Sequence, residues 1–309
     1  MITLYPEKIK RKFGLVRKNY DLYLLLIPGL LYLIIFKYVP MKGIVISFMD
    51  FDIFKGILGS PWVGFKQFST LFSMPDFYRV FFNTLIISVY KIVFTFPIPI
   101  IVALLLNEIG SMIFKRVSQT VIYLPHFLSW VIVGGLFINI LSPSDGIVNQ
   151  IITGLGLKPV NFLMDNHFFR GVVVFTEGWK ETGWSAIIYI AAIAGIEQDQ
   201  YNAAVIDGAG KLQQIWYVTI PGIMSTIVLL FILRLGSIMD AGFEQVFVMY
   251  NPAVYDSGDI IGTFIYRIGI SNMKYSFATA AGLFNSLIGF ILLISGNFIS
   301  KRLLQKSIW

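Results

Sequence analysis

The sequence predicts an all-α membrane protein with six transmembrane helices, and three observations lead to this fold class. Of the 309 residues, 56% are hydrophobic and only 13% are charged, and the mean hydropathy of +0.75 lies outside the range of soluble proteins. Six apolar stretches are long enough to cross about 30 Å of hydrocarbon, which takes roughly 20 helical residues. These stretches are continuously apolar and lack the alternating pattern of membrane barrel strands.

The limits of these stretches define the predicted spans. They cover residues 21–39, 80–106, 118–141, 171–196, 217–239 and 276–299. Four prolines lie in or near spans, where neighbouring helices can satisfy the freed backbone groups, so we expect each to mark a kink or a span end rather than a functional hinge. They are Pro28, Pro97, Pro99 and Pro125. No small-residue cleavage site follows the first apolar run, "LLLIPGLLYLIIFKYVP", which therefore predicts an uncleaved anchor.

Lys and Arg residues predict the orientation of the spans. They gather before the first span, after the last span and in the short loop between the second and third: Lys8, Lys10, Arg11, Lys12, Arg17, Lys18, Lys115, Arg116, Lys301, Arg302 and Lys306. We therefore expect both termini in the cytoplasm, with 1–20 as a basic N-terminus and 301–309 as a tail. The segments 40–78, 142–170 and 240–275 are longer and sparser in positive charge, so we expect them outside.

Two stretches come close to enzyme motifs without completing them. "DGAGK" ends like a phosphate-binding loop, but Leu212 follows Gly210-Lys211 where the motif has Ser or Thr, and Val205 stands where it has its first Gly. "GWSAI" at 183–187 lacks the closing Gly of a nucleophile elbow. We therefore expect no catalytic residues in this chain.

Metal, thiol and nucleic-acid chemistry are not expected either. The chain has two histidines, His126 and His167, and no cysteine, which provides no cluster of metal ligands. The lack of cysteine also excludes disulfides. The net charge of +7 comes mostly from the Lys and Arg residues that set the orientation of the spans, so it does not predict a nucleic-acid partner. We expect no metal and no cofactor on this chain.

A polar, small-residue segment lies between the fourth and fifth spans, where residues 201–221 read "YNAAVIDGAGKLQQIWYVTIP". We predict a helix, a tight turn at 207–210 and a second helix on the inner face, because Gly208 or Gly210 can adopt positive φ at little cost. Three alanines leave the surface shallow enough for another protein to approach: Ala203, Ala204 and Ala209. Composition alone fits two roles equally, a docking element for a protein or a helix that rests on the membrane surface.

This segment resembles the signature of permease subunits of binding-protein-dependent type I ABC importers, whose pattern is Glu-Ala-Ala, then Asp-Gly-Ala, then Ile-x-Leu-Pro. The matching residues are Ala203, Ala204, Asp207, Gly208, Ala209, Ile220 and Pro221. Asn202 stands where the family has Glu, and "TIP" at 219–221 replaces the usual hydrophobic run before Pro. The resemblance implies docking on an ATPase through a coupling helix at 201–210, with contacts from Tyr201, Asn202, Ala203, Ala204, Asp207, Gly208 and Ala209.

Further stretches resemble the subfamily that imports oligosaccharides and polysaccharide fragments. They are "GWKETGWSAIIYIAAIAGIEQDQYNAA" at 178–204, "GFEQVFVMYNP" at 242–252, "YSFATAAGLFNSLIGFILL" at 275–293 and the final "SIW". The resemblance implies a type I permease domain over 21–300, with a cytoplasmic coupling segment at 197–216, in a bacterial cytoplasmic membrane. It also implies a second homologous permease, two ATPase subunits that hold ATP and Mg, an extracellular solute-binding lipoprotein and an oligosaccharide substrate. ATP hydrolysis then belongs to the ATPase subunits, and this chain is not an enzyme.

Charged side chains within the fourth and fifth spans point to a substrate site. At membrane depth a charge costs at least about 2.5–3.5 kcal/mol on insertion scales, so it usually faces a cavity or a partner. Carboxylates suit sugar hydroxyls and tryptophan rings cover sugar C–H surfaces, and Glu177, Glu181 and Trp184 share one helix face. We predict substrate contacts at Glu177, Trp179, Glu181, Trp184, Arg234, Ser237 and Asp240. The alternative is a structural Glu–Lys or Glu–Arg network that includes Lys180 and bridges the spans.

These patterns favour an ATP-driven oligosaccharide importer over two other classes. An ion-coupled secondary sugar transporter is the main alternative, and an intramembrane glycan-modifying enzyme is a third. A secondary carrier needs no ATPase-docking loop and often shows repeated halves with broken helices. Copurification of ATPase chains, or their absence, distinguishes the classes.

Overall fold

The computed structural model describes residues 19–304, and this part of the chain is helical. Its one β feature is an isolated antiparallel bridge between Met49 and Trp62. The basic residues before Asn19, from Lys8 to Lys18, lie outside the described part, as do Lys306 and the final "SIW". The all-α fold class is confirmed for the described residues.

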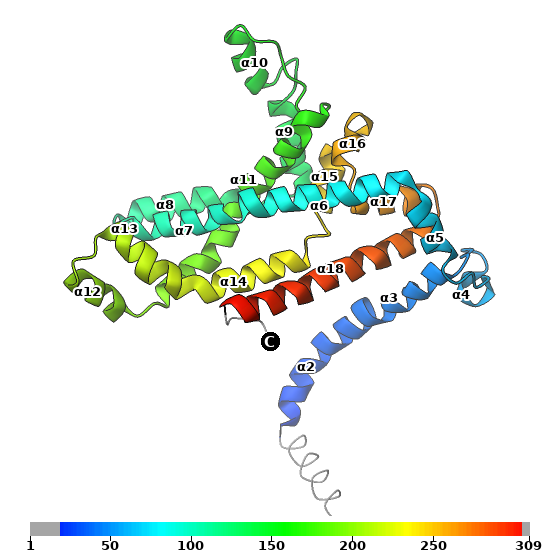
Figure 1. Ribbon diagram of the computed structural model, residues 1–309, viewed down its shortest axis with the longest axis horizontal. Coiled ribbons are helices and arrows are strands. Elements are labelled where there is room, and N and C mark those ends of the chain that lie inside the picture. The colour runs from blue at the N-terminus through cyan, green and yellow to red at the C-terminus, as the bar shows by residue number, and fades with distance from the viewer. Residues whose placement is uncertain (1–18, 305–309) are drawn as a thin grey trace, which may run out of the picture.

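The first helix stands apart from the rest of the molecule (Figure 1). It runs without interruption from Tyr20 to Phe48 over 29 residues, through α2 (Tyr20–Leu33), a π-helical turn (Ile34–Tyr38), α3 (Val39–Met41) and a 3-10 helix (Lys42–Phe48). No residue of the first three parts is buried, whereas the last part packs against α18 (Tyr275–Leu304). Its apolar side chains therefore face lipid or another protein.

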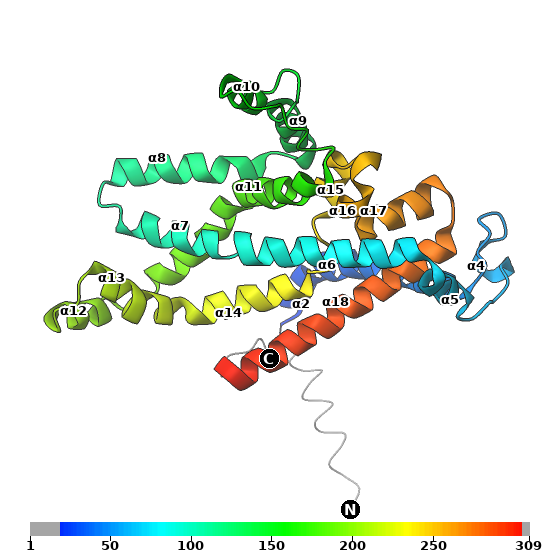
Figure 2. The ribbon, with the colours of Figure 1, turned by 45° about the horizontal axis from the view of Figure 1, so that its top comes forward.

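In the described part of the chain, five helices form the body of the bundle, and two of them lie end to end as one span. The second span comprises α6 (Pro75–Thr95) and α7 (Pro97–Glu108), with Pro97 in the first turn of α7, where a missing N–H costs nothing. Across both of them runs α11 (Asn166–Ala194), which also contacts α14 (Ile220–Gly236), and α14 in turn packs on α18. Figure 2 shows α6 and α7 lying end to end, with α14 and α18 below them. A buried cluster of Ala103, Ala186, Tyr189, Ile193 and Ile223 joins α7, α11 and α14.

The third predicted span is sharply bent rather than continuous. Its parts are α8 (Met112–Tyr123) with a 3-10 turn (Leu124–Phe127), and α9 (Trp130–Ile140), which meet at 101°. The predicted span over 118–141 is therefore a bent pair of helices, in which Ser129 caps the start of the second helix by accepting a hydrogen bond from the backbone N–H of Ile132 (3.3 Å). Pro125 lies in the 3-10 turn directly before the bend, which agrees with the kink expected there.

By length and composition, the described residues contain four helices able to cross a membrane, or five if the bent pair is one span. They are Tyr20–Phe48, Pro75–Glu108, Lys211–Gly236, Tyr275–Arg302 and the pair Met112–Phe127 with Trp130–Ile140. The predicted fourth span falls on α11, which has 29 residues but carries several charged ones and is not among them. The six-span count therefore stays a prediction.

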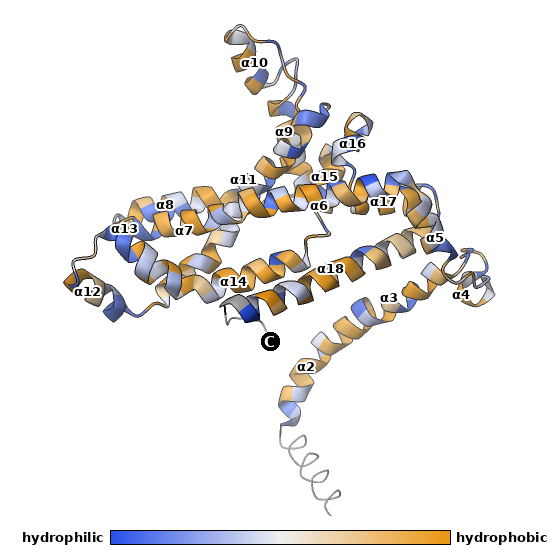
Figure 3. Cartoon of the chain, viewed as in Figure 1, coloured by the Kyte–Doolittle hydropathy of each residue, from blue (hydrophilic) through white to orange (hydrophobic). Residues whose placement is uncertain are grey.

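Shorter helices lie at the ends of the long ones. α4 (Gly56–Gly59), α5 (Lys66–Ser73) and α17 (Ile261–Tyr266) lie at one end, and α12 (Gln198–Ile206) with α13 (Lys211–Gln214) at the other (Figure 1). α10 (Ile147–Gly154) projects from the bundle beyond α9, and α15 (Phe243–Met249) and α16 (Tyr255–Gly258) lie near the base of this projection. Figure 3 shows mostly hydrophobic residues along α7, α14 and α2, and a mixture of hydrophilic and hydrophobic residues at α12.

Candidate transport and coupling sites

A buried cluster of three charges joins the three central helices. Glu177 on α11 forms ion pairs with Lys91 of α6 and with Arg234 of α14, one through each carboxylate oxygen. Only 1% of the Lys91 side chain and 8% of the Glu177 side chain are exposed, whereas Arg234 is 39% exposed. Glu177 therefore has no free oxygen in this conformation, as the alternative of a structural charge network requires.

Lys91 also binds the segment that follows the end of α14. Its ammonium group donates hydrogen bonds to the carbonyl oxygen of Ala241 (2.9 Å) and to Oε1 of Gln245 (2.6 Å). Between α14 and α15 the backbone leaves the helix, and Ala241 and Gly242 adopt positive φ of 50° and 77°. A Cβ at position 242 would collide with the Lys91 ammonium group, so glycine fits both the conformation and the space. The sequence reasoning missed Lys91, although it lies alone in the apolar run of the second span.

Four of the predicted substrate residues meet where the helix is broken between α14 and α15, at residues 237–242, which are called the polar break below. Glu177, Arg234, Ser237 and Asp240 line a polar cavity of 80 Å³, and the first three also line a neighbouring cavity of 260 Å³ with Glu181. The Ser237 hydroxyl donates to the carbonyl oxygen of Arg234 (3.1 Å), and Asp240 accepts a long hydrogen bond from the Phe243 N–H (3.4 Å). Both side chains are exposed to the space beside α14.

A second polar cluster surrounds the bend of the third span. His126 lies in the 3-10 turn, and its Nδ1 is 2.8 Å from Oε2 of Glu181. Lys180 donates to the other oxygen of Glu181 (3.0 Å) and to the carbonyl oxygen of His126 (2.8 Å). The ring of Trp184 stacks on the His126 ring, with centroids 4.5 Å apart and planes 3° apart. His126 was missed as a site residue because its partners lie more than fifty positions away in the sequence.

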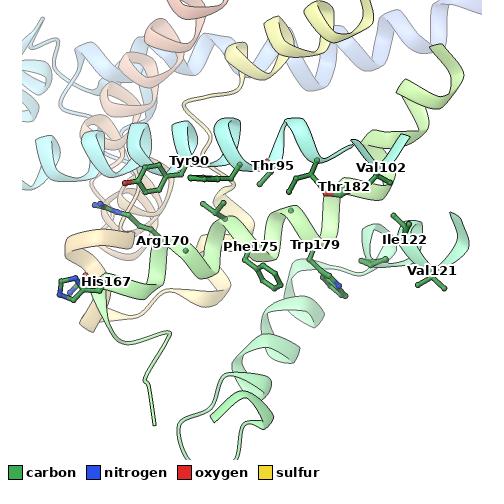
Figure 4. A pocket seen from close by; sticks show the side chains of 17 residues that line it. Tyr90, Thr95, Val102, Val121, Ile122, His167, Arg170, Phe175, Trp179 and Thr182 are labelled. Atoms are coloured by element: carbon green, nitrogen blue, oxygen red, sulfur yellow. The ribbon is translucent and has the colours of Figure 1, made fainter. Parts of the chain in front are cut away.

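Trp179 lies on a different face of α11 from Glu177. It lines a groove of 990 Å³ between α6, α7, α8 and α11, together with Tyr90, Thr95 and Phe175 (Figure 4). Arg170 and His167 lie at one end of this groove. The seven predicted substrate residues are thus divided between the polar break beside α14, the bend of the third span and an apolar groove.

At the end of the bundle opposite α12 (Figure 1), Asn83 and Arg170 fix the loop around α16. The Asn83 amide donates to the carbonyl oxygens of Asp256 (3.0 Å) and Asp259 (3.1 Å), and accepts from Arg170 (2.7 Å). Asp259 is fully buried and paired with Arg267. Hydrogen bonds from Arg267 to this carboxylate raise the pKa of the guanidinium above its ordinary value, so Arg267 stays charged at any physiological pH.

The segment between α11 and α14 has the helix, turn and second helix that its sequence predicts. The first helix, α12, ends at Ile206 rather than at residue 210, and Gly208 turns the chain with φ of 79°. The Gly210 N–H donates to Oε1 of Gln213 (2.7 Å), which begins α13. No residue of α12 is buried, and Asn202 and Ala203 are exposed. The hydroxyls of Tyr201 and Thr219 are 3.0 Å apart and tie α12 to the start of the fifth span.

An all-helical bundle with several helices long and apolar enough to cross a membrane is the architecture of a multi-pass membrane protein. Residues 95–306 match the family model described as the binding-protein-dependent transport system inner membrane component. The chain belongs to this family, whose members are permease subunits of ABC importers, as the resemblance of residues 201–221 implied.

Relatives match the chain over nearly its whole length. Protein LplB of Bacillus subtilis (strain 168) is 45% identical over 294 residues, covering 95% of this chain and 92% of that protein. The polygalacturonan/rhamnogalacturonan transport system permease protein YteP of the same organism is 42% identical over 309 residues, covering 100% and 96%.

A solved structure shows the same architecture. It is the crystal structure of a bacterial alginate ABC transporter in complex with an alginate pentasaccharide-bound periplasmic protein. One of its chains has a TM-score of 0.88 and 38% identity, covering 96% of this chain and 100% of that one. The fold is therefore that of a type I ABC importer permease.

Proposed function

We propose that this chain is one permease of an ATP-driven importer of oligosaccharides released from polysaccharides, in a bacterial cytoplasmic membrane. The observation that carries the proposal is full-length similarity to a polygalacturonan/rhamnogalacturonan permease and to a chain of an alginate transporter. The polar break beside α14 offers charged and hydroxyl groups at the depth where a sugar must cross.

The partners follow from the class of transporter. A second homologous permease completes the translocation pathway, two ATPase subunits hold ATP and Mg on the inner face, and an external binding protein delivers the sugar. The structural relative supports the last of these, because it is in complex with a sugar-loaded periplasmic protein. We further propose that α11 is the fourth of six spans and that both termini lie in the cytoplasm.

Coupling takes place through α12, which docks on an ATPase. No residue of α12 is buried, Ala203 and Ala204 keep part of its surface shallow, and only residues 195–197 separate it from α11. Closure of the ATPases on ATP moves α12, and the Tyr201–Thr219 contact carries this motion to the start of the fifth span. Binding of the loaded external protein biases the same equilibrium from the other side of the membrane.

The predicted substrate residues divide into two groups by their contacts. Both carboxylate oxygens of Glu177 and of Glu181 are paired within the chain, so these residues position their neighbours. Five residues keep exposed atoms and contact the sugar: Trp179, Trp184, Arg234, Ser237 and Asp240. Trp184 offers one ring face, because His126 covers the other.

Copurification and ATP hydrolysis test this function. The chain is expressed together with candidate partner permease, ATPase and binding-protein chains, and the membrane complex is isolated through a tag on this chain. We expect ATPase subunits in the complex, and ATP hydrolysis that rises when sugar-loaded binding protein is added. A complex without ATPase chains would contradict the proposal.

A further inference from the structure

The bend of the third span is held by a single turn of α11. On one side of the bend, the Lys180 ammonium group binds the carbonyl oxygen of His126 at 2.8 Å. On the other side, the same group lies over the ring of Trp130, the first residue of α9, at 5.3 Å from its centroid. One lysine of α11 therefore contacts both halves of the broken span.

The His126 side chain is fixed by two further contacts with the same turn. A carboxylate can only accept hydrogen bonds, so the Nδ1 of His126 that meets Glu181 at 2.8 Å carries the hydrogen. The stacked ring of Trp184 sets the plane of the imidazole. Glu181 is itself held by Lys180, so position and orientation of the histidine are both determined by α11.

Gly183 lets the backbones of α11 and α8 pack closely at this turn. Gly183 lies against Ile122, and a Cβ at position 183 would collide with the carbonyl carbon and oxygen of that residue. No side chain separates the two helices here, and packed interiors do not deform continuously. The contacts of Lys180, Glu181, Gly183 and Trp184 with Ile122, His126 and Trp130 are called the bend interface below.

We propose that the bend interface makes α11 and the bent span move as one body, with His126 as a positioning residue for coupling. The inference rests on the proposed function, in which α12 moves with the ATPases. Residues 195–197 connect α12 to α11, while α9 leads to the projecting α10. A displacement of α12 on the inner face therefore reaches the outer projection through the bend interface.

Chemical cross-linking tests this directly, because the chain has no cysteine of its own. The double variant His126→Cys/Glu181→Cys removes the hydrogen bond and permits a short bis-methanethiosulfonate link in its place. Before linking, we expect sugar imported per ATP hydrolysed to fall about tenfold, the factor expected for one lost charge-assisted hydrogen bond. After linking, we expect the wild-type ratio to return. Three results overturn the proposal: a link that blocks import, a link that leaves sugar import per ATP low, or an unlinked variant that already imports as much sugar per ATP as the wild type.

The linking rate gives a second readout that needs no transport. If the two segments move as one body, the rate is the same without nucleotide and with a non-hydrolysable ATP analogue. A rate that changes several-fold between these states overturns the proposal. Sugar import by the wild-type complex is measured as a control. A wild-type complex that hydrolyses ATP but imports no sugar contradicts the proposed function and not the bend interface.

Single variants separate a coupling role from a folding role. His126→Asn keeps a donor nitrogen near the position of Nδ1, so we expect nearly wild-type coupling. His126→Leu removes both donor and aromatic ring, and we expect ATP hydrolysis to persist while sugar imported per ATP falls about tenfold. An unchanged ratio in His126→Leu, or parallel loss of hydrolysis and import in both variants, contradicts the assignment.

Discussion

The carboxylate of Glu177 on α11 is paired with the guanidinium of Arg234 on α14, while its second oxygen is paired with Lys91 of α6. This arrangement ties together the two helices that flank the coupling segment. Because two cations share one buried carboxylate, loss of either leaves Glu177 partly compensated, and the two losses need not be equal.

Lys91→Met is expected to destabilise the protein more than Arg234→Met. Lys91 is almost fully buried, so its removal leaves Glu177 with one cation and leaves the carbonyl oxygen of Ala241 and Oε1 of Gln245 without this donor, at a cost of about 1–3 kcal/mol for each unsatisfied group. Arg234 is partly exposed and solvent screens its loss, so its effect is smaller. Melting temperature in detergent measures the difference. Adding Glu177→Gln to Lys91→Met should restore part of the loss, and equal melting of both single variants would contradict this ranking.

Ala203→Asp is expected to abolish ATP hydrolysis stimulated by the binding protein. Ala203 is exposed on α12, so the change adds a charge to the docking surface without disturbing a core. Ala194→Asp is the matched control, because Ala194 is also exposed but lies at the end of α11. Both proteins should reach the membrane in normal amounts. Stimulated hydrolysis that survives Ala203→Asp would remove the docking assignment of α12.

Asn202→Glu is expected to strengthen the contact with the ATPase. Asn202 is exposed at the position where the signature that this segment resembles has Glu, and a carboxylate can accept a charge-assisted hydrogen bond about twice as strong as the neutral one. The dissociation constant of the ATPase from the detergent-solubilised complex measures the effect, with Asn202→Gln as control. An affinity unchanged by Glu would mean that position 202 faces no cation on the ATPase.

Trp179→Leu is expected to slow sugar import while lowering the melting temperature no more than Phe175→Leu, because both rings pack on Phe137. Its partly exposed ring lines the 990 Å³ groove, and an aromatic contact is worth about 0.5–1.5 kcal/mol, enough for a several-fold change in rate. Phe175→Leu is the control, since Phe175 lines the same groove and was not predicted to bind sugar. Equal import in the two variants would exclude Trp179 as a sugar contact.

Local signals predicted the coupling segment well because its structure depends on neighbouring residues. A glycine at positive φ and a helix start at Lys211 are properties of a few consecutive residues. Hydropathy also located the apolar helices that cross the bundle. It could not reveal the 101° bend, because residues 118–141 stay apolar through the break at Ser129.

The charged sites were only partly predictable, since their partners come from distant segments. Glu177 and Arg234 stood out as charges within spans, yet nothing in the sequence shows that Lys91 completes the cluster. From the sequence, His126 was considered only as a metal ligand, whereas in the structure it contacts Lys180, Glu181 and Trp184. Such contacts depend on how helices pack, which composition and spacing do not specify.

Sugar uptake into proteoliposomes tests the central claim most directly. The complex of both permeases and the ATPases is reconstituted with ATP inside, and binding protein loaded with labelled oligosaccharides from polygalacturonan or alginate is added outside. The account predicts accumulation that requires internal ATP and the binding protein and persists when ionophores abolish ion gradients. Uptake that proceeds without ATP and stops when the ion gradient is abolished would contradict it.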